Sequence, residues 1–353
     1  MHSADRNAQL DGLRGIAALN VAIFHTILGM DESLTQRVVY GKFSELNGPY
    51  DWLAKIILKV FSGETAVFIF FVLSGAVLFQ NLVRDSSPSF ATAGKFIVRR
   101  TCRIYPALIG CLLFMTAVSA TMGHPVILTN LLINASLFDF PINGVTWTLN
   151  VEMVGVAFVL LAYFGYRFAG LIGLGVATAG IWLFLRFSGV PIALTFKYFW
   201  FYFVIGMIIP TAAGKSVAKL LPSWSVIPIL LTVIFFKSTI QQVAIGLLVT
   251  MLFYDRAGRF GSWLSTSWPQ FLGRISYSFY LYNFVVFVNF CAYARSFTWV
   301  TARPLEAGLL ASVVTVMATI PLAYLSMRYV EMPGIALGRQ LASRSELTKI
   351  QTI

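Results

Sequence analysis

The chain has 353 residues and a formal net charge of +12, with 58% hydrophobic residues and only 11% charged residues. Soluble domains carry about 25% charged residues, so this composition excludes an ordinary soluble protein and indicates an integral membrane protein. The basic residues are dispersed at the ends of apolar stretches, which argues against nucleic-acid binding and is consistent with the positive-inside rule. The three cysteines have no CxxC spacing, so they predict neither a disulfide framework nor a metal site.

Apolar stretches of roughly 15 to 22 residues predict an all-α integral membrane protein with about ten transmembrane helices. The stretches lie at residues 11–30, 62–83, 104–121, 148–166, 168–186, 196–211, 225–238, 240–254, 272–293 and 306–328. The seventh and eighth stretches, 225–238 and 240–254, are the ones least clearly predicted to span a membrane.

The distribution of basic residues predicts that both termini are cytoplasmic. In that orientation 17 of the 26 lysine and arginine residues fall on the inner side, as the positive-inside rule favours. Two long outer segments, 31–61 and 122–147, are then candidate lids or acceptor-binding loops; the alternative is that they are only linkers. We expect one transmembrane domain over residues 1–333 and a short cytoplasmic tail at 334–353.

The first apolar stretch carries three ionisable residues, Asp11, Arg14 and His25. Asp11 and Arg14 interrupt it too early for a signal peptide, so we expect it to remain as a helix. Eleven residues of helix turn through three turns and about 20°, so Arg14 and His25 share one face about 16 Å apart, with Asp11 on the same stripe. Ionisable groups inside a spanning helix usually mark a functional site. The alternative is that Arg14 extends to the lipid headgroups and His25 only packs.

Small residues in the second and sixth stretches predict close helix packing. Gly75 follows Ser74 in the second stretch, and Gly206 lies in the sixth. Glu64 stands at the outer beginning of the second stretch, where it is a candidate for lining a substrate path.

A basic cluster precedes the third stretch. Arg100 and Arg103 are three residues apart and share a helix face, and Tyr105 follows them. Paired guanidinium groups suit phosphate oxygens, which they bind bidentately. The alternative is an ordinary basic cluster that only sets the topology.

The fourth stretch opens with Trp147 and carries Asn150 and Glu152. A glutamate that is buried early in a spanning segment needs a partner or a proton, and Arg14 and His25 are the partners we expect. The alternative is that Glu152 caps or packs structurally.

The ninth stretch carries Tyr277, Tyr280 and Asn283 near its beginning. Their hydroxyl, ring and amide groups could line a polar channel, although interfacial tyrosines commonly only anchor a helix.

Taken in order, these motifs resemble those of the membrane acyltransferase-3 family, bacterial O-acyltransferases of surface glycans. The resemblance spans Leu10 to Pro333. It rests on LDGLRGIAALNVAIFH, in which ten residues separate an arginine from a histidine, and on FFVLSG, the RxxR pair, WTLNVE, GRISYSFYLYN and the closing E-x-P at Glu331, which we interpret as a helix end. Two positions depart from the family pattern. Thr148 replaces a serine, and Asn283 replaces a histidine, which removes any base role at that position.

The resemblance implies a membrane-embedded acyltransferase of the inner membrane. It would move an acyl group, for which acetyl is expected, from cytoplasmic acyl-coenzyme A to a hydroxyl of an exported or surface glycan or its lipid-linked precursor. The expected partners are therefore the bilayer, acyl-coenzyme A as a co-substrate and the glycan acceptor. We expect no permanently bound cofactor, and the oligomeric state is open.

Roles follow for the matching residues. His25 would be the general base, Glu152 would orient or balance it, and Arg14 would stabilise the oxyanion or hold the donor's pyrophosphate. Arg100 and Arg103 would receive the donor phosphates, with Tyr105 and Ser74 beside the donor. The remaining candidates would line the substrate path: Asp11, Glu64, Trp147, Asn150, Tyr277, Tyr280 and Asn283. In this arrangement the two arginines lie at the cytoplasmic face, and His25 and Glu152 lie in the outer half.

Two other classes of protein are compatible with the same residues. A transporter of an anionic or lipid-linked substrate could use Arg14, Glu152 and the arginine pair for binding without chemical change. A structural subunit of a polysaccharide export complex would tolerate the loss of His25.

Overall fold

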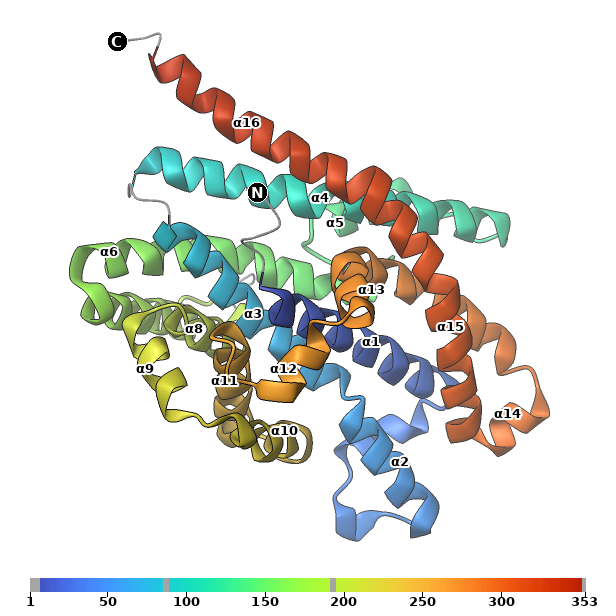
Figure 1. Ribbon diagram of the computed structural model, residues 1–353. Coiled ribbons are helices and arrows are strands. Elements are labelled where there is room, and N and C mark those ends of the chain that lie inside the picture. The colour runs from blue at the N-terminus through green and yellow to red at the C-terminus, as the bar shows by residue number, and fades with distance from the viewer. Residues whose placement is uncertain (1–6, 85–88, 191–194, 351–353) are drawn as a thin grey trace.

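The computed structural model describes residues 7–84, 89–190 and 195–350, and all of its regular secondary structure in these ranges is helical (Figure 1). The predictions that concern residues 1–6 and 351–353 lie outside the described residues. The helices are α1 (Ala8–Met30), α2 (Gly48–Val60), α3 (Gly63–Arg84), α4 (Phe90–Thr121), α5 (Leu128–Ala135), α6 (Trp147–Phe187), α8 (Trp200–Ile208), α9 (Ala212–Leu220), α10 (Val226–Phe235), α11 (Thr239–Phe253), α12 (Gly258–Leu264), α13 (Ser267–Ala294), α14 (Thr298–Ala302), α15 (Pro304–Ser326) and α16 (Met332–Ile350).

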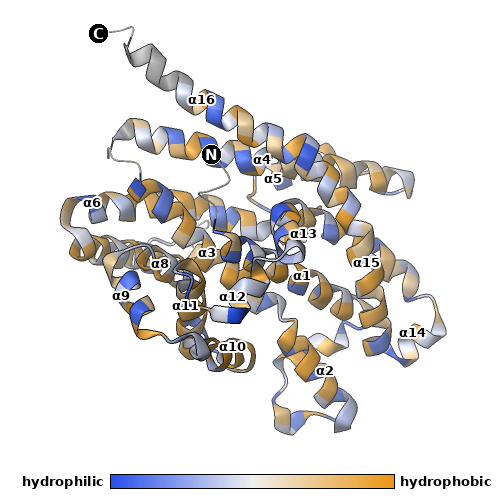
Figure 2. Cartoon of the chain, viewed as in Figure 1, coloured by the Kyte–Doolittle hydropathy of each residue, from blue (hydrophilic) through white to orange (hydrophobic). Residues whose placement is uncertain are grey.

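Each of the ten predicted stretches contains a helix, but fewer segments are long and apolar enough to cross a membrane. Within the described residues there are six such segments, or seven if the bent pair α8 and α9 is one span. Helices α10 and α11 are apolar but shorter than these membrane-spanning segments. Figure 2 shows hydrophobic residues over most of the helical surface, with hydrophilic residues on α9 and α12. The chain is therefore a multi-pass membrane protein, and the count of ten spans stays a prediction.

Helix α6 is a hairpin of two arms rather than one long rod. Gly170 adopts a positive φ of 58°, which glycine tolerates without steric conflict, and the chain reverses there. Across the reversal, a Cβ at Gly165 would lie 2.6 Å from the carbonyl oxygen of Gly173, and the rings of Phe158 and Phe184 lie 6.2 Å apart. The arms correspond to the fourth and fifth predicted stretches.

The core is built around α1, which packs against α3, α13 and α15 (Figure 1). Glycines set the closest crossings. A Cβ at Gly15 would lie 2.5 Å from the backbone nitrogen of Gly273, which brings α1 against α13. A Cβ at Gly75 would lie 2.5 Å from the carbonyl oxygen of Phe203, and one at Gly206 would lie 2.3 Å from that of Val72. The predicted close packing at Gly75 and Gly206 is confirmed.

The segment between α5 and α6 is tied into the helical bundle by buried side chains, and the prediction of a lid or acceptor-binding loop over 122–147 stays a prediction. Asn134 and Asn143 are fully buried. The Asn134 Oδ1 accepts hydrogen bonds from the backbone N–H groups of Ile142 and Asn143, and its Nδ2 donates to the Thr146 hydroxyl. The Asn143 Nδ2 donates to the carbonyl oxygen of Leu281 in α13 at 3.2 Å. We call Asn134, Asn143 and Thr146 the asparagine clasp; it places the start of α6 inside the bundle.

The last part of the chain remains helical, so the prediction that Glu331 and Pro333 end the helical region is wrong. A π-helical turn at Met327–Glu331 leads directly into α16, which lies alongside α4 in Figure 1. The contact is close, because a Cβ at Gly338 would lie 2.7 Å from the Cβ of Cys102. Glu331 is buried and accepts a hydrogen bond from the Ser278 hydroxyl at 3.0 Å.

Candidate functional site

The ionisable residues at the start of α1 form a local pair. The Arg14 guanidinium donates to the Asp11 carboxylate at 3.1 Å, and Asp11 is buried. Residues three apart in a helix lie on one face, so the spacing alone positions this contact. Arg14 is therefore held against Asp11 on its own helix and is only 20% exposed.

Three helices meet at Glu152. Its Oε1 lies 3.4 Å from an amino group of Arg100 on α4 and 3.4 Å from the Ser74 hydroxyl on α3. The Arg100 and Glu152 side chains are only 13% and 22% exposed, so the ion pair is largely shielded from solvent. The positive charges of Arg14 and Arg103 also act on Arg100. We call Arg14, Arg100, Arg103, Glu152 and Ser74 the arginine cluster.

The expected pairing of Glu152 with His25 is not what the structure contains. No hydrogen bond or ion pair joins these two residues in the described parts of the chain, and Arg100 takes the carboxylate instead. The physical reason is the asparagine clasp: because the clasp draws the start of α6 into the bundle, Glu152 reaches the depth of Arg100. Glu152 and the arginines therefore share one level, contrary to the prediction that they lie in different halves.

The arginine cluster carries a net positive charge. The cluster holds three arginines and one carboxylate, Glu152, and Asp11 beside it balances Arg14, which leaves one arginine charge without an acidic partner. Arg103 is half-buried and makes no hydrogen bond or ion pair to any residue that the structure describes. A buried or half-buried guanidinium without an acidic partner is suited to a phosphate oxygen. Tyr105 packs against the hydrophobic residues between α4 and α13, and it makes no hydrogen bond to the arginine cluster among the described residues.

His25 lies on α1 between two aromatic rings. Its imidazole stacks on Phe287 with ring centroids 5.8 Å apart, and Phe24 meets it edge-on at 5.6 Å. The His25 side chain has no hydrogen-bond partner among the described residues and is half-buried. Because α1 is continuous, eleven residues place His25 about 16 Å along the axis from Arg14.

Aromatic and hydroxyl side chains at the start of α6 contact α3 and α13. The Tyr280 hydroxyl donates to the carbonyl oxygen of Val145 at 3.1 Å and accepts from the Thr148 hydroxyl, also at 3.1 Å. The Trp147 ring packs against Phe71 and Phe199. Trp147 and Tyr280 thus join α6 to α3 and α13, and their predicted place along a substrate path stays a prediction.

The remaining predicted residues are held by structural contacts. Asn150 donates to the carbonyl oxygen of Leu137, and the Tyr277 hydroxyl donates to that of Ile104 at 2.7 Å. Asn283 is buried and its amide donates to the Thr319 hydroxyl on α15 at 3.4 Å, so it joins α13 to α15. Glu64 belongs to a separate surface pocket, where it pairs with Lys237 at 3.4 Å.

Two groups of polar residues were not predicted as groups from the sequence, although Glu64 was named by itself. Hydropathy does not predict the asparagine clasp, because Asn134, Asn143 and Thr146 are polar residues that are nevertheless buried near the start of α6. The pocket around Glu64 draws its lysines from segments far apart in the sequence, so no linear motif marks it. Among the described residues, no group of three or more histidine, cysteine, aspartate or glutamate side chains could hold a metal ion.

Comparison with known proteins gives the family. No match was found among curated proteins or among solved structures. A family model described as an acyltransferase domain matches residues 7–328, which extend from the residue before α1 into the π-helical turn after α15. Because this match takes in both the arginine cluster and His25 and most of the chain, the protein belongs to the acyltransferase-3 family and is a multi-pass membrane acyltransferase.

Proposed function

We propose that the protein moves an acyl group, most simply acetyl, from cytoplasmic acyl-coenzyme A to a hydroxyl of an exported or surface glycan or its lipid-linked precursor. The observation that carries the proposal is the pairing of two sites on one helix. The arginine cluster at one level of α1 is suited to phosphates, and the imidazole of His25 lies about 16 Å farther along the same helix. The inner membrane is the compartment in which cytoplasmic acyl-coenzyme A and an exported acceptor meet.

The arginine cluster would hold the phosphates of the donor. Arg103 has no acidic partner in the described chain, and Arg14 and Arg100 add to the positive charge around it. Glu152 would keep Arg100 in position and limit the mutual repulsion of the arginines, with Ser74 as a second contact to the same carboxylate oxygen. The pantetheine arm of coenzyme A, extended along α1, would carry its thioester toward His25.

His25 would act as a general base in direct transfer. A ring nitrogen takes the proton of the acceptor hydroxyl, the oxygen attacks the thioester carbonyl, and the carbon–sulfur bond breaks as the new ester forms. The thiolate leaves and takes up the proton from the imidazolium, which returns the histidine to its neutral form. Packing between Phe24 and Phe287 would orient the ring without a carboxylate partner.

The proposal is tested with the purified protein in vesicles, supplied with acetyl-coenzyme A and a cell-envelope glycan fraction. Thiol release and incorporation of labelled acetyl into the glycan are measured together. His25→Ala should lower kcat about 10²-fold or more and leave the donor KM near that of the wild type, because a general base contributes about 10²–10⁴-fold. Arg103→Ala should instead raise the donor KM.

The control is Lys215→Ala, because Lys215 is exposed on α9, which contributes to neither the arginine cluster nor the lysine pocket. That variant should keep the wild-type rate. Unchanged transfer by His25→Ala would contradict the assigned base. Movement of a substrate across the vesicle membrane with the thioester intact would favour the transporter.

A further inference from the structure

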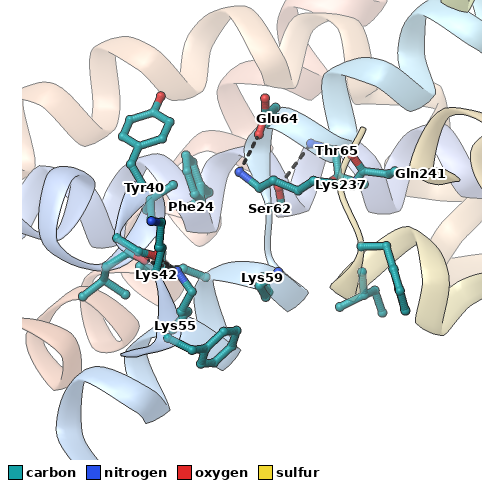
Figure 3. Close-up of a pocket in the computed structure, with 17 residues that line it drawn as sticks. Phe24, Tyr40, Lys42, Lys55, Lys59, Ser62, Glu64, Thr65, Lys237 and Gln241 are labelled. Atoms are coloured by element: carbon teal, nitrogen blue, oxygen red, sulfur yellow. Dashed lines mark hydrogen bonds and ion pairs between the residues drawn. The ribbon is translucent and has the colours of Figure 1, made fainter. Parts of the chain in front are cut away.

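A lysine-rich pocket of about 370 Å³ lies at the end of the bundle formed by α2 and the beginning of α3 (Figure 3). Its walls come from residues 38–43, from α2, from the start of α3 and from the connection between α10 and α11. Four lysines line it, Lys42, Lys55, Lys59 and Lys237, against one carboxylate, Glu64. Its volume falls within the range of small-molecule sites, about 300–1,000 Å³.

The charge of this lysine pocket is only partly balanced. Lys55 is 6% exposed, and its Nζ donates to the carbonyl oxygens of Val38 and Gly41, both at 2.6 Å. Neither Lys55 nor Lys59 forms an ion pair with a described residue. The Lys59 Nζ instead donates to the carbonyl oxygen of Phe235. The Lys59 and Lys237 charges repel that of Lys55.

The two remaining lysines have exposed carboxylate partners. The Lys237–Glu64 pair spans 3.4 Å and the Lys42–Glu45 pair 3.9 Å, with more than half of each side chain exposed. Exposed pairs contribute little free energy, so a competing anion can replace either carboxylate. Figure 3 shows these side chains approaching the pocket from different elements, with Lys237 directed at Glu64. An anion in the pocket would therefore relieve the repulsion among the lysines.

The lysine pocket adjoins the proposed base. Phe24 lines the pocket, and its ring meets the His25 imidazole edge-on at 5.6 Å. Polar groups suited to sugar hydroxyls are also present, because Gln241 donates to the Thr65 hydroxyl within the same lining. Phe24 is therefore a neighbour of both the pocket and His25.

From these contacts we infer that the lysine pocket binds an acidic acceptor, a glycan bearing carboxylate or phosphate groups, beside His25. The inference rests on the proposed function, because it identifies the class of acceptor for that reaction. The carboxylate or phosphate groups would contact Lys59 and Lys237, and the hydroxyl to be acylated would extend past Phe24.

The test measures binding without an acyl donor, so that it does not depend on transfer. The full chain in phosphatidylcholine nanodiscs is titrated with trigalacturonate, an acidic trisaccharide, and with the neutral trisaccharide maltotriose. The pocket variant carries Lys59→Gln and Lys237→Gln; Lys55 is left intact because its two hydrogen bonds hold residues 38–41. The control variant carries Lys215→Gln and Lys219→Gln, an equal change of charge at exposed positions of α9.

We expect trigalacturonate to bind at least tenfold more tightly than maltotriose and to weaken as salt is raised. The pocket variant should lose at least tenfold in affinity, and the control variant should match the wild type. Equal affinity of the pocket variant and the wild type would overturn the inference, as would equal binding of the two trisaccharides by the wild type. Displacement of trigalacturonate by phosphatidylglycerol in the nanodisc would also overturn it and assign the pocket to a lipid headgroup.

The wild-type salt titration and the comparison of the two sugars decide the question even if the pocket variant does not fold. Failure of transfer with intact trigalacturonate binding would contradict the proposed function. Failure of binding with intact transfer to a glycan would contradict the acidic acceptor alone.

Discussion

Arg100 and Glu152 form an ion pair at the same distance as Lys237 and Glu64, 3.4 Å, but in a different environment. The first pair is 13% and 22% exposed, and the second is 55% and 52% exposed. A shielded charge that loses its partner is left without solvation, whereas an exposed one regains water. The two pairs therefore separate the effect of burial from that of distance.

We expect Glu152→Gln to lower the free energy of unfolding by about 1–3 kcal/mol, because Arg100 then lies unpaired near Arg14 and Arg103. The double variant Arg100→Gln with Glu152→Gln should regain most of that loss and still bind the donor weakly. Thermal unfolding in detergent measures the first effect and the donor KM the second. Glu64→Gln is the control and should change stability by less than about 1 kcal/mol. Equal losses from Glu152→Gln and Glu64→Gln would contradict a role for burial.

Residue contacts could be predicted from the sequence where they are local. The Asp11–Arg14 pair follows from a spacing of three within one helix, and the structure contains it. The partner of Glu152 could not be predicted in this way, because it depends on the depth at which α6 begins. That depth is fixed by Asn134 and Asn143, and no periodicity marks them.

At the scale of elements, the asparagine clasp controls where α6 starts. Asn134→Leu removes the acceptor of two backbone N–H groups, a half-buried one at Ile142 and a buried one at Asn143, and the donor to Thr146. Each unsatisfied buried group costs about 1–3 kcal/mol, so the variant should be destabilised by at least about 2 kcal/mol. The donor KM should also rise, because Glu152 would lose its alignment with Arg100.

Asn130→Leu on the same helix, α5, is the matched control for Asn134→Leu. Asn130 makes no side-chain hydrogen bond to a described residue, so stability and donor KM should both stay near those of the wild type. Stability measurements in detergent and donor titrations of both variants check the prediction. If Asn134→Leu lowers stability and leaves the donor KM unchanged, the clasp supports the fold without positioning Glu152.

Helices were predicted more successfully than the segments between them, and the cause is physical. Long apolar stretches must satisfy their own backbone hydrogen bonds in a membrane, so α1, α3, α4, α13 and α15 follow from hydropathy. The glycine contacts at Gly75 and Gly206 could also be predicted, because close helix crossings require small residues. The fold of 136–146 depends on hydrogen bonds of buried asparagines to residues far away in the sequence, such as the bond from Asn143 to the carbonyl oxygen of Leu281. Hydropathy does not predict such bonds.

At the scale of the whole molecule, one helix connects the arginine cluster, His25 and the lysine pocket. Arg14 lies near one end of α1, while His25 and Phe24 lie near the other, and Phe24 lines the pocket. The rise of an α-helix fixes the separation of Arg14 and His25 at about 16 Å. Under the proposed function, a donor held at the arginine cluster would have to span that distance for its thioester to meet an acceptor in the pocket, and donor and acceptor would then approach from opposite ends of α1.

The orientation of the chain decides whether this arrangement matches a cytoplasmic donor. The beginning of α4, near Gly94, lies on the side of Arg100, and His124 lies beyond the far end of the same helix. We expect Gly94→Cys to be labelled by a membrane-impermeant thiol reagent only after cells are permeabilised, and His124→Cys to be labelled from outside, with the native cysteines replaced by alanine. Both positions are exposed, and a side chain at Gly94 meets no atom within 4 Å, so access depends on topology rather than packing. The reverse labelling would place Arg100 and Arg103 toward the outer face, and a cytoplasmic acyl-coenzyme A could then not reach them.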